Sequence, residues 1–200
     1  MDMVDTSILK ELYFLWRPVF PYLVSFIKEI YKREHGDIME AGPFCGPLFS
    51  LKSERIGDRH VIATFPRGMG KFYRDEAIAK GHNDILVVES TDTFSCFKDS
   101  CFDLIIFRGG LFFPELFHVD YWRIYSLLKK GGIGLIGGGF GMYTPKEIIE
   151  GIKERSKELN LLAGKIDVSL RELEERIIPE RLKGVIEVFA EGGLWTILRK

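Results

Sequence analysis

Short apolar runs alternate with longer amphipathic segments along most of this chain, and glycines often separate the two. Runs such as I-L-V-V and L-I-I-F are apolar throughout, which is typical of strands buried on both faces of a sheet. The pattern predicts strands at 38–40, 60–65, 84–89, 102–107 and 133–136. Between and after them it predicts helices at 47–54, 70–80, 118–130 and from 145 to about 159.

Strands that alternate with helices indicate an α/β fold whose sheet is mostly parallel and covered on both faces. The last two apolar runs, 185–189 and 194–198, are joined by A-E-G-G and predict a hairpin, so one of them must be antiparallel. We therefore expect a three-layer sandwich around a seven-stranded sheet whose last strand is antiparallel. Ligands of such open sheets bind at the carboxyl ends of the strands.

Residues 1–35 follow a different pattern and predict two aromatic-rich helices, at 7–16 and 21–34. The apolar stretch 12–27 is a poor membrane span, because Arg17 and two prolines interrupt it. We expect these helices to form a cap that packs on a single main domain, residues 36–200. A role at a membrane surface is the less favoured alternative.

Capping signals define several helix ends. Thr6 or Ser7 is the expected start of the first helix. Two lysines and Gly131 are expected to end the helix at 118–130. The sequences T-P-K-E from Thr144 and S-L-R-E from Ser169 are both capping boxes and predict helix starts.

Composition narrows the classes of function. The 200 residues include 28 basic and 29 acidic side chains, so the net charge of −1 gives no whole-chain case for nucleic-acid binding. Three cysteines without a C-x-x-C pair predict reduced thiols in a cytoplasmic protein. We find no zinc-ligand spacing and expect no metal, and no phosphate loop or serine–histidine–acid order is present.

The loop after the first predicted strand is the strongest candidate for function. The stretch from Asp37 reads D-I-M-E-A-G-P-F-C-G and holds one acid, Glu40, and two glycines, Gly42 and Gly46. Glycine lets a backbone approach a nucleotide-like ligand closely, and an acid accepts hydrogen bonds from it. A tight turn that binds no ligand is the alternative interpretation.

The order of these parts resembles that of class I S-adenosylmethionine-dependent methyltransferases. Glu40-Ala41-Gly42 opens a loop similar to the acid-x-glycine-x-glycine-x-glycine motif of that family. The segment F-S-C-F-K-D-S-C-F-D-L-I-I is similar to the region around its fourth strand, and L-K-K-G-G to the turn before its fifth. The resemblance covers residues 36–200 and implies that S-adenosylmethionine is the cofactor, S-adenosylhomocysteine the product and a small molecule the methyl acceptor.

The resemblance also implies the positions of the cofactor contacts. Glu40 would lie near the amino group of the methionine part, Asp92 or Thr91 near the adenine amine, and Phe94 beside the adenine face. The cofactor residues implied in full are Glu40, Gly42, Phe44, Gly46, Phe65, Thr91, Asp92, Phe94, Arg108 and Gly109. The substrate residues implied are Phe113, His118 and Tyr143, and no catalytic residue is assigned.

Two positions depart from the family pattern. Phe44 replaces the middle glycine of the loop, and Phe65 or Thr64 stands where the family has an acid that binds the ribose hydroxyls. A phenylalanine cannot accept those hydrogen bonds, and losing them would cost on the order of 2–3 kcal/mol.

These departures keep two other hypotheses open. One is a non-catalytic binding or partner module with the same fold. The other, which is less favoured, is a nicotinamide-dependent oxidoreductase, because Gly42 and Gly46 resemble a short variant of that fingerprint. His118 and Tyr143 also have simpler interpretations, as a surface histidine and as a loop-packing residue.

Overall fold

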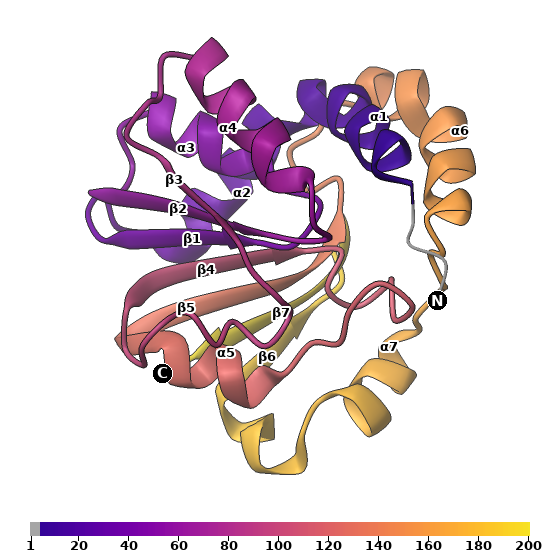
Figure 1. Ribbon diagram of the computed structural model, residues 1–200. Helices are drawn as coiled ribbons and strands as arrows, with labels where there is room; N and C mark the ends of the chain where they lie inside the picture. The colour runs from indigo at the N-terminus through magenta and orange to yellow at the C-terminus, as the bar shows by residue number, and fades with distance from the viewer. Residues whose placement is uncertain (1–4) are drawn as a thin grey trace.

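A seven-stranded sheet forms the centre of the part of the chain that the structure describes (Figure 1). This computed structural model describes residues 5–200, apart from the side chain of Arg176. The strand order is β3-β2-β1-β4-β5-β7-β6, and β7 runs antiparallel to both of its neighbours. The expected α/β fold is thereby confirmed. The strands are β1 (Asp37–Ala41), β2 (Arg59–Thr64), β3 (Leu86–Glu89), β4 (Phe102–Arg108), β5 (Leu128–Gly139), β6 (Ile186–Phe189) and β7 (Gly193–Arg199).

Helices cover both faces of this sheet. Figure 1 shows α3 and α4 over one face and α5 over the other, while α1 and α6 lie side by side near the carboxyl ends of the strands. The helices are α1 (Thr6–Trp16), α2 (Phe20–Tyr31), α3 (Pro47–Ser53), α4 (Met69–Ala79), α5 (Tyr121–Leu127), α6 (Lys146–Leu162) and α7 (Leu170–Glu172). Tighter or wider turns are η1 (Arg17–Val19), η2 (Leu173–Ile177) and η3 (Glu180–Val185).

The alternation of side chains along each strand produces two cores. In β1, Ile38 packs into a cluster with residues of α2, α3 and α4, whereas the next residue, Met39, packs on the opposite face with residues of α5. In β4, Ile106 joins the first cluster and Phe107 the second. Because successive strand residues point to opposite faces, a continuously apolar strand requires cover on both, as observed.

The N-terminal helices pack on the rest of the chain through α1 against α6 and α2 against α3. The cap expected over residues 1–35 includes residues 1–4, which lie outside the described residues. The first helix starts one residue earlier than expected: Asp5, rather than Thr6 or Ser7, is the cap, and its carboxylate accepts a hydrogen bond from the Ser7 backbone at 2.8 Å. Within residues 5–200, no helix has the length and apolar character needed to cross a membrane.

The helix predicted at 118–130 is much shorter in the structure. Asp120 caps it by accepting a hydrogen bond from the Arg123 backbone at 3.0 Å, and α5 ends at Leu127. Leu128 is already extended and pairs with Phe102 of β4. The lysines assigned to a helix end therefore belong to β5, because pairing with a neighbouring strand outweighs their local preference.

The two predicted capping boxes differ in outcome. Thr144 does not cap α6, because its hydroxyl donates to the Phe140 carbonyl instead, and the helix begins after Pro145 without a side-chain cap. Ser169 does cap α7, since its hydroxyl accepts a hydrogen bond from the Glu172 backbone at 3.2 Å.

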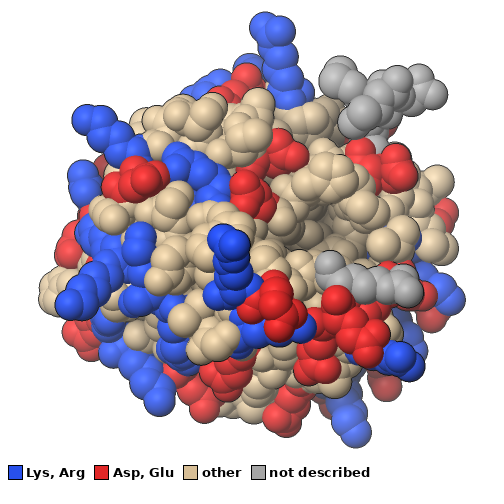
Figure 2. Space-filling view, turned by 90° about the horizontal axis from the view of Figure 1, so that it is seen from below, with Lys and Arg blue, Asp and Glu red and all other residues tan. Residues whose placement is uncertain are grey.

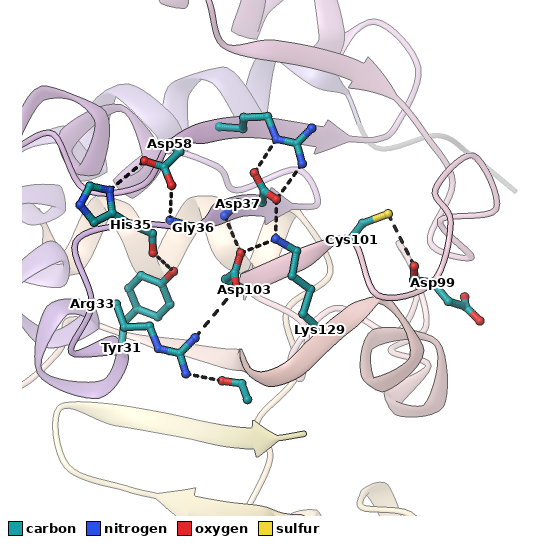
Figure 3. A network of polar contacts seen from close by, with 12 residues as sticks. Tyr31, Arg33, His35, Gly36, Asp37, Asp58, Asp99, Cys101, Asp103 and Lys129 are labelled. Carbon is teal, nitrogen blue, oxygen red and sulfur yellow. Dashed lines mark hydrogen bonds and ion pairs between the residues drawn. The ribbon is translucent and has the colours of Figure 1, made fainter.

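A network of charged side chains ties the amino ends of four strands together (Figure 3). Asp37 accepts hydrogen bonds from Arg59, at 2.5 and 2.7 Å, and from the Lys129 ammonium at 2.6 Å. Lys129 also donates to Asp103 at 2.7 Å. The hydrogen bond from Arg59, with a smaller contribution from Lys129, lowers the pKa of Asp37 to about 2 despite partial desolvation. These groups lie at the edge of the sheet opposite the carboxyl ends of the strands.

Candidate ligand site at the carboxyl ends of the strands

Glu40 holds the start of α3 in place. Its carboxylate is fully buried, and Oε2 accepts hydrogen bonds from the backbone of Gly46 and of Leu48, each at 2.9 Å. Burial raises the pKa of Glu40 to about 7, although the charge of Arg108 and the two backbone donors oppose the shift. The second oxygen, Oε1, is buried without a hydrogen-bond partner among the described residues.

Arg108 lies at the end of β4, beside the same loop. Its Nη1 donates to the Phe44 carbonyl at 2.9 Å, and its guanidinium carbon lies 4.9 Å from the Trp16 ring centre and 5.3 Å from that of Phe20. Its Nε is buried and has no partner among the described residues. Burial lowers the pKa of Arg108, and the charge of Glu40 acts in the opposite sense. Cation–π contacts thus replace part of the lost hydration.

Aromatic rings lie against the glycines that were expected to face a cofactor. A Cβ atom added to Gly46 would lie 2.2 Å from the Phe20 ring, and one added to Gly42 would lie 2.8 Å from Phe107. A Cβ atom on Gly109, which has a φ of +76°, would lie 2.5 Å from the Phe44 ring. These glycines therefore make room for side chains of this same chain.

A cluster of phenylalanines occupies the region beyond β1, β2 and β4. The Phe65 ring centre lies 6.1 Å from those of Phe94 and Phe107 and 5.4 Å from that of Phe117. Phe65, Phe94, Phe107 and Phe117 are all buried. Phe44 packs on Phe113, with ring centres 4.5 Å apart.

A cavity of about 480 Å³ opens beside this cluster, under α1 and α6. Of the predicted cofactor residues, Phe44, Arg108 and Gly109 line it, and so does Phe113 from the predicted substrate residues. Cys45 also lines it; burial raises the pKa of its thiol, as expected for a small filler.

The other predicted site residues lie outside the cavity. Glu40, Gly42, Gly46, Phe65 and Phe94 are buried behind or beside it. Thr91 exchanges a hydrogen bond with Thr93 at 2.7 Å, and Asp92 accepts one from the His118 backbone at 3.0 Å. The side chain of His118 is exposed, and the Tyr143 hydroxyl donates to Glu29.

Sequence reasoning missed the contribution of α6 to this cavity and its contact with Trp16 of α1. Trp16 stacks on Phe140, with ring centres 4.7 Å apart and planes 3° apart, and its Nε1 donates to the Ser156 hydroxyl at 2.9 Å. Five α6 residues line the cavity: Lys153, Ser156, Lys157, Asn160 and Leu161. Residues spaced three and four apart lie on one face of a helix, so this shared face could have been recognised from the sequence.

Comparisons with solved structures identify the fold of this chain, whereas comparisons of its sequence find no match. No family model matches the chain, and no curated protein matches it by sequence. Among solved structures, it is similar to a proposed S-adenosyl-L-methionine-dependent methyltransferase from Methanococcus maripaludis. The identity is 22%, the TM-score is 0.72, and the match covers 100% of this chain and 95% of that one. The chain has the class I methyltransferase fold.

Two further structures share this methyltransferase fold. A SAM-dependent methyltransferase from Aquifex aeolicus is 14% identical with a TM-score of 0.54, over 98% of this chain and 97% of that one. PigF, in a structure with SAH, is 20% identical with a TM-score of 0.54, over 90% of this chain and 55% of that one.

Within residues 5–200 of this protein, no group of histidine, cysteine and acidic side chains has the arrangement of a metal site.

Proposed function

We propose that this protein is an S-adenosylmethionine-dependent methyltransferase that acts on a small molecule. The observation that carries the proposal is the cavity beyond β1 and β4, the adjacent strands at which the strand order reverses. Open parallel sheets bind ligands at such a point. The methyltransferase descriptions of the Methanococcus and Aquifex structures and the SAH in the PigF structure support the same class. The three free cysteines support a cytoplasmic location.

One half of the cofactor finds suitable groups in this chain. The methionine end would run along the backbone of Phe44 and Cys45 and beside Gly109, all of which line the cavity. Its ammonium group needs an acceptor, and Glu40 Oε1 is a buried acceptor without a partner among the described residues. An ammonium there would offset the desolvation of the Glu40 carboxylate.

The residues at the other half do not fit an adenosine in the arrangement described. Phe65 offers no acceptor for ribose hydroxyls. A planar base held between two rings needs them about 7 Å apart, twice the usual carbon contact of about 3.5 Å. The Phe65 and Phe94 ring centres are 6.1 Å apart and their planes are tilted by 52°. We infer that these rings must separate before adenosine can bind.

The same cluster favours a second candidate function, a non-catalytic binding module that keeps the fold. In that case the phenylalanines are a permanent core and no cofactor enters.

If the protein is an enzyme, the bound cofactor supplies a methyl group activated on a sulfonium. The remaining work for the protein is to position an acceptor and exclude water.

Isothermal titration calorimetry with S-adenosylhomocysteine separates the two candidates. The enzyme proposal predicts binding with a dissociation constant below about 1 mM, and no heat with NADH at the same concentrations. The enzyme proposal also predicts that the Phe65→Leu variant binds S-adenosylhomocysteine several-fold more tightly than the native protein does. The reason is that a smaller side chain must move out of the half of the site where adenosine would lie. Phe97→Leu is the matched control, because Phe97 is not one of the four clustered phenylalanines. Its ring packs instead on that of Phe102, with ring centres 5.4 Å apart. Absence of binding to both the native protein and Phe65→Leu would support the non-catalytic module instead.

A further inference from the structure

The walls of the cavity are flat and aromatic. On the side of α1, the indole of Trp16 and the ring of Phe140 stack in parallel, and the bond from Trp16 to Ser156 fixes the indole against α6. The Phe44 and Phe113 rings, which contact each other, form another part of the wall. Stacked and edge-on ring contacts favour a planar apolar body over a flexible polar one.

One strongly polar group interrupts these aromatic walls. The Arg108 side chain lines the cavity although only 7% of its surface is exposed. The Phe44 carbonyl takes a hydrogen bond from Nη1. Neither Nε nor Nη2 donates to any residue within 5–200, and Nε is buried. Nη2 is therefore the guanidinium nitrogen that can reach a ligand, and it can donate a charge-assisted hydrogen bond to one oxygen of a carboxylate.

The charged residues of the mouth have the sign that attracts an anion. Lys153, Lys157 and Lys165 line it together with a single carboxylate, Asp167. Among the described residues none of these lysines forms an ion pair, and Lys165 lies over the Phe112 ring at 5.3 Å. Over the face shown in Figure 2, basic and acidic residues are interspersed. Cations gathered at the rim of an apolar cavity raise the local concentration of anions.

We propose that this cavity binds a planar aromatic carboxylate, with the ring among the aromatic side chains of the walls, beside Phe113, and the carboxylate on Arg108. The lysines of the mouth attract the anion, and Arg108 holds it. The proposal rests on the proposed function in one respect only, namely that this ligand is the methyl acceptor. A volume of about 480 Å³ suits a bicyclic ring, since ligand pockets usually span about 300–1,000 Å³.

The test is calorimetry with 2-naphthoate and its neutral analogue 2-naphthamide, in low salt and without cofactor. We expect naphthoate to bind at least tenfold more tightly than naphthamide. Arg108→Gln should weaken naphthoate binding by about a hundredfold and abolish the preference for the acid, because a charge-assisted pair is lost. Equal binding of acid and amide, no heat with naphthoate at about 1 mM, or an unchanged affinity in Arg108→Gln would each overturn the proposal.

The lysines give a second set of variants that carries little risk to folding, since Lys153 and Lys157 are exposed. Each glutamine substitution should weaken naphthoate binding two- to threefold in low salt and have less effect as salt screens the charges. Lys146→Gln, on the same helix but outside the cavity, is the control and should bind as the native protein does. If Arg108→Gln unfolds, the acid preference of the native protein and the lysine variants decide the question. Because no cofactor is present, failure here is distinguishable from failure to bind S-adenosylhomocysteine.

Discussion

Gly46→Ala tests how tightly the N-terminal helices close over the glycine loop. The added methyl carbon would lie 2.2 Å from Cε2 and Cζ of Phe20, whereas carbon atoms normally approach to about 3.5 Å. The ring must therefore move by more than 1 Å. Phe20 is only 4% exposed and packs on Tyr13 and Arg108, so the ring cannot move without losing contacts.

The expected cost follows from two mechanisms. Overpacking a core costs about 1–3 kcal/mol, and complete expulsion of a buried phenylalanine costs about 3–5 kcal/mol. We expect Gly46→Ala to lower the free energy of unfolding by about 3 kcal/mol. Phe20→Leu removes the ring atoms that would clash and alone should cost about 1 kcal/mol. The double variant should then be more stable than the sum of the single effects by at least about 1 kcal/mol.

Equilibrium unfolding in urea, followed by tryptophan fluorescence and circular dichroism, measures these free energies. Gly151→Ala is the matched control, because nothing lies within 4 Å of a Cβ atom there and Gly151 is inside α6. It should stabilise the protein by up to about 1 kcal/mol. Additive effects of Gly46→Ala and Phe20→Leu, or a Gly46→Ala variant as stable as the native protein, would refute the packing described here.

Two further predictions concern stability and pH. The folded protein holds a proton on Glu40 up to about pH 7 whereas the unfolded chain releases it near pH 4.5, so the free energy of unfolding should fall by about 3 kcal/mol as pH rises across that range. Glu40→Gln cannot titrate, and urea titrations that show the same fall in this variant would contradict the assignment. Asp37 shifts in the opposite sense: its salt bridges stabilise the fold fully above pH 3.8, and about 2 kcal/mol should be lost as pH falls towards 2. Asp37→Asn should lack this loss in acid unfolding monitored by circular dichroism, and a native-like acid profile in the variant would argue against it.

The sequence predicted the order of the elements because that information is local. Continuous apolar runs marked buried strands, and the A-E-G-G turn marked the final hairpin, which the structure confirms as β6 and β7. The local signals failed where tertiary pairing decides. Leu128 and the lysines after it lie in β5 because β4 offers a partner, and Thr144 bonds back to Phe140 instead of capping α6.

The candidate site was predictable only in part, for the same reason. Glu40 and Gly46 are close in sequence, so their loop could be identified, but Phe20 covers Gly46 from a helix 26 residues earlier in the chain. The role of Phe65 depends on Phe94, Phe107 and Phe117, which come from separate segments. A single sequence indicates that these residues are apolar, but not that their rings meet in the half of the site where adenosine would lie.

A crystal structure of the protein soaked with S-adenosylhomocysteine tests the central proposal most directly. The proposal predicts density for the homocysteine end beside Phe44 and Gly109, with its ammonium on Glu40, and for adenosine between separated rings of Phe65 and Phe94. Unchanged rings with no density beyond β1 and β4 at saturating ligand would contradict it and leave the fold without this cofactor.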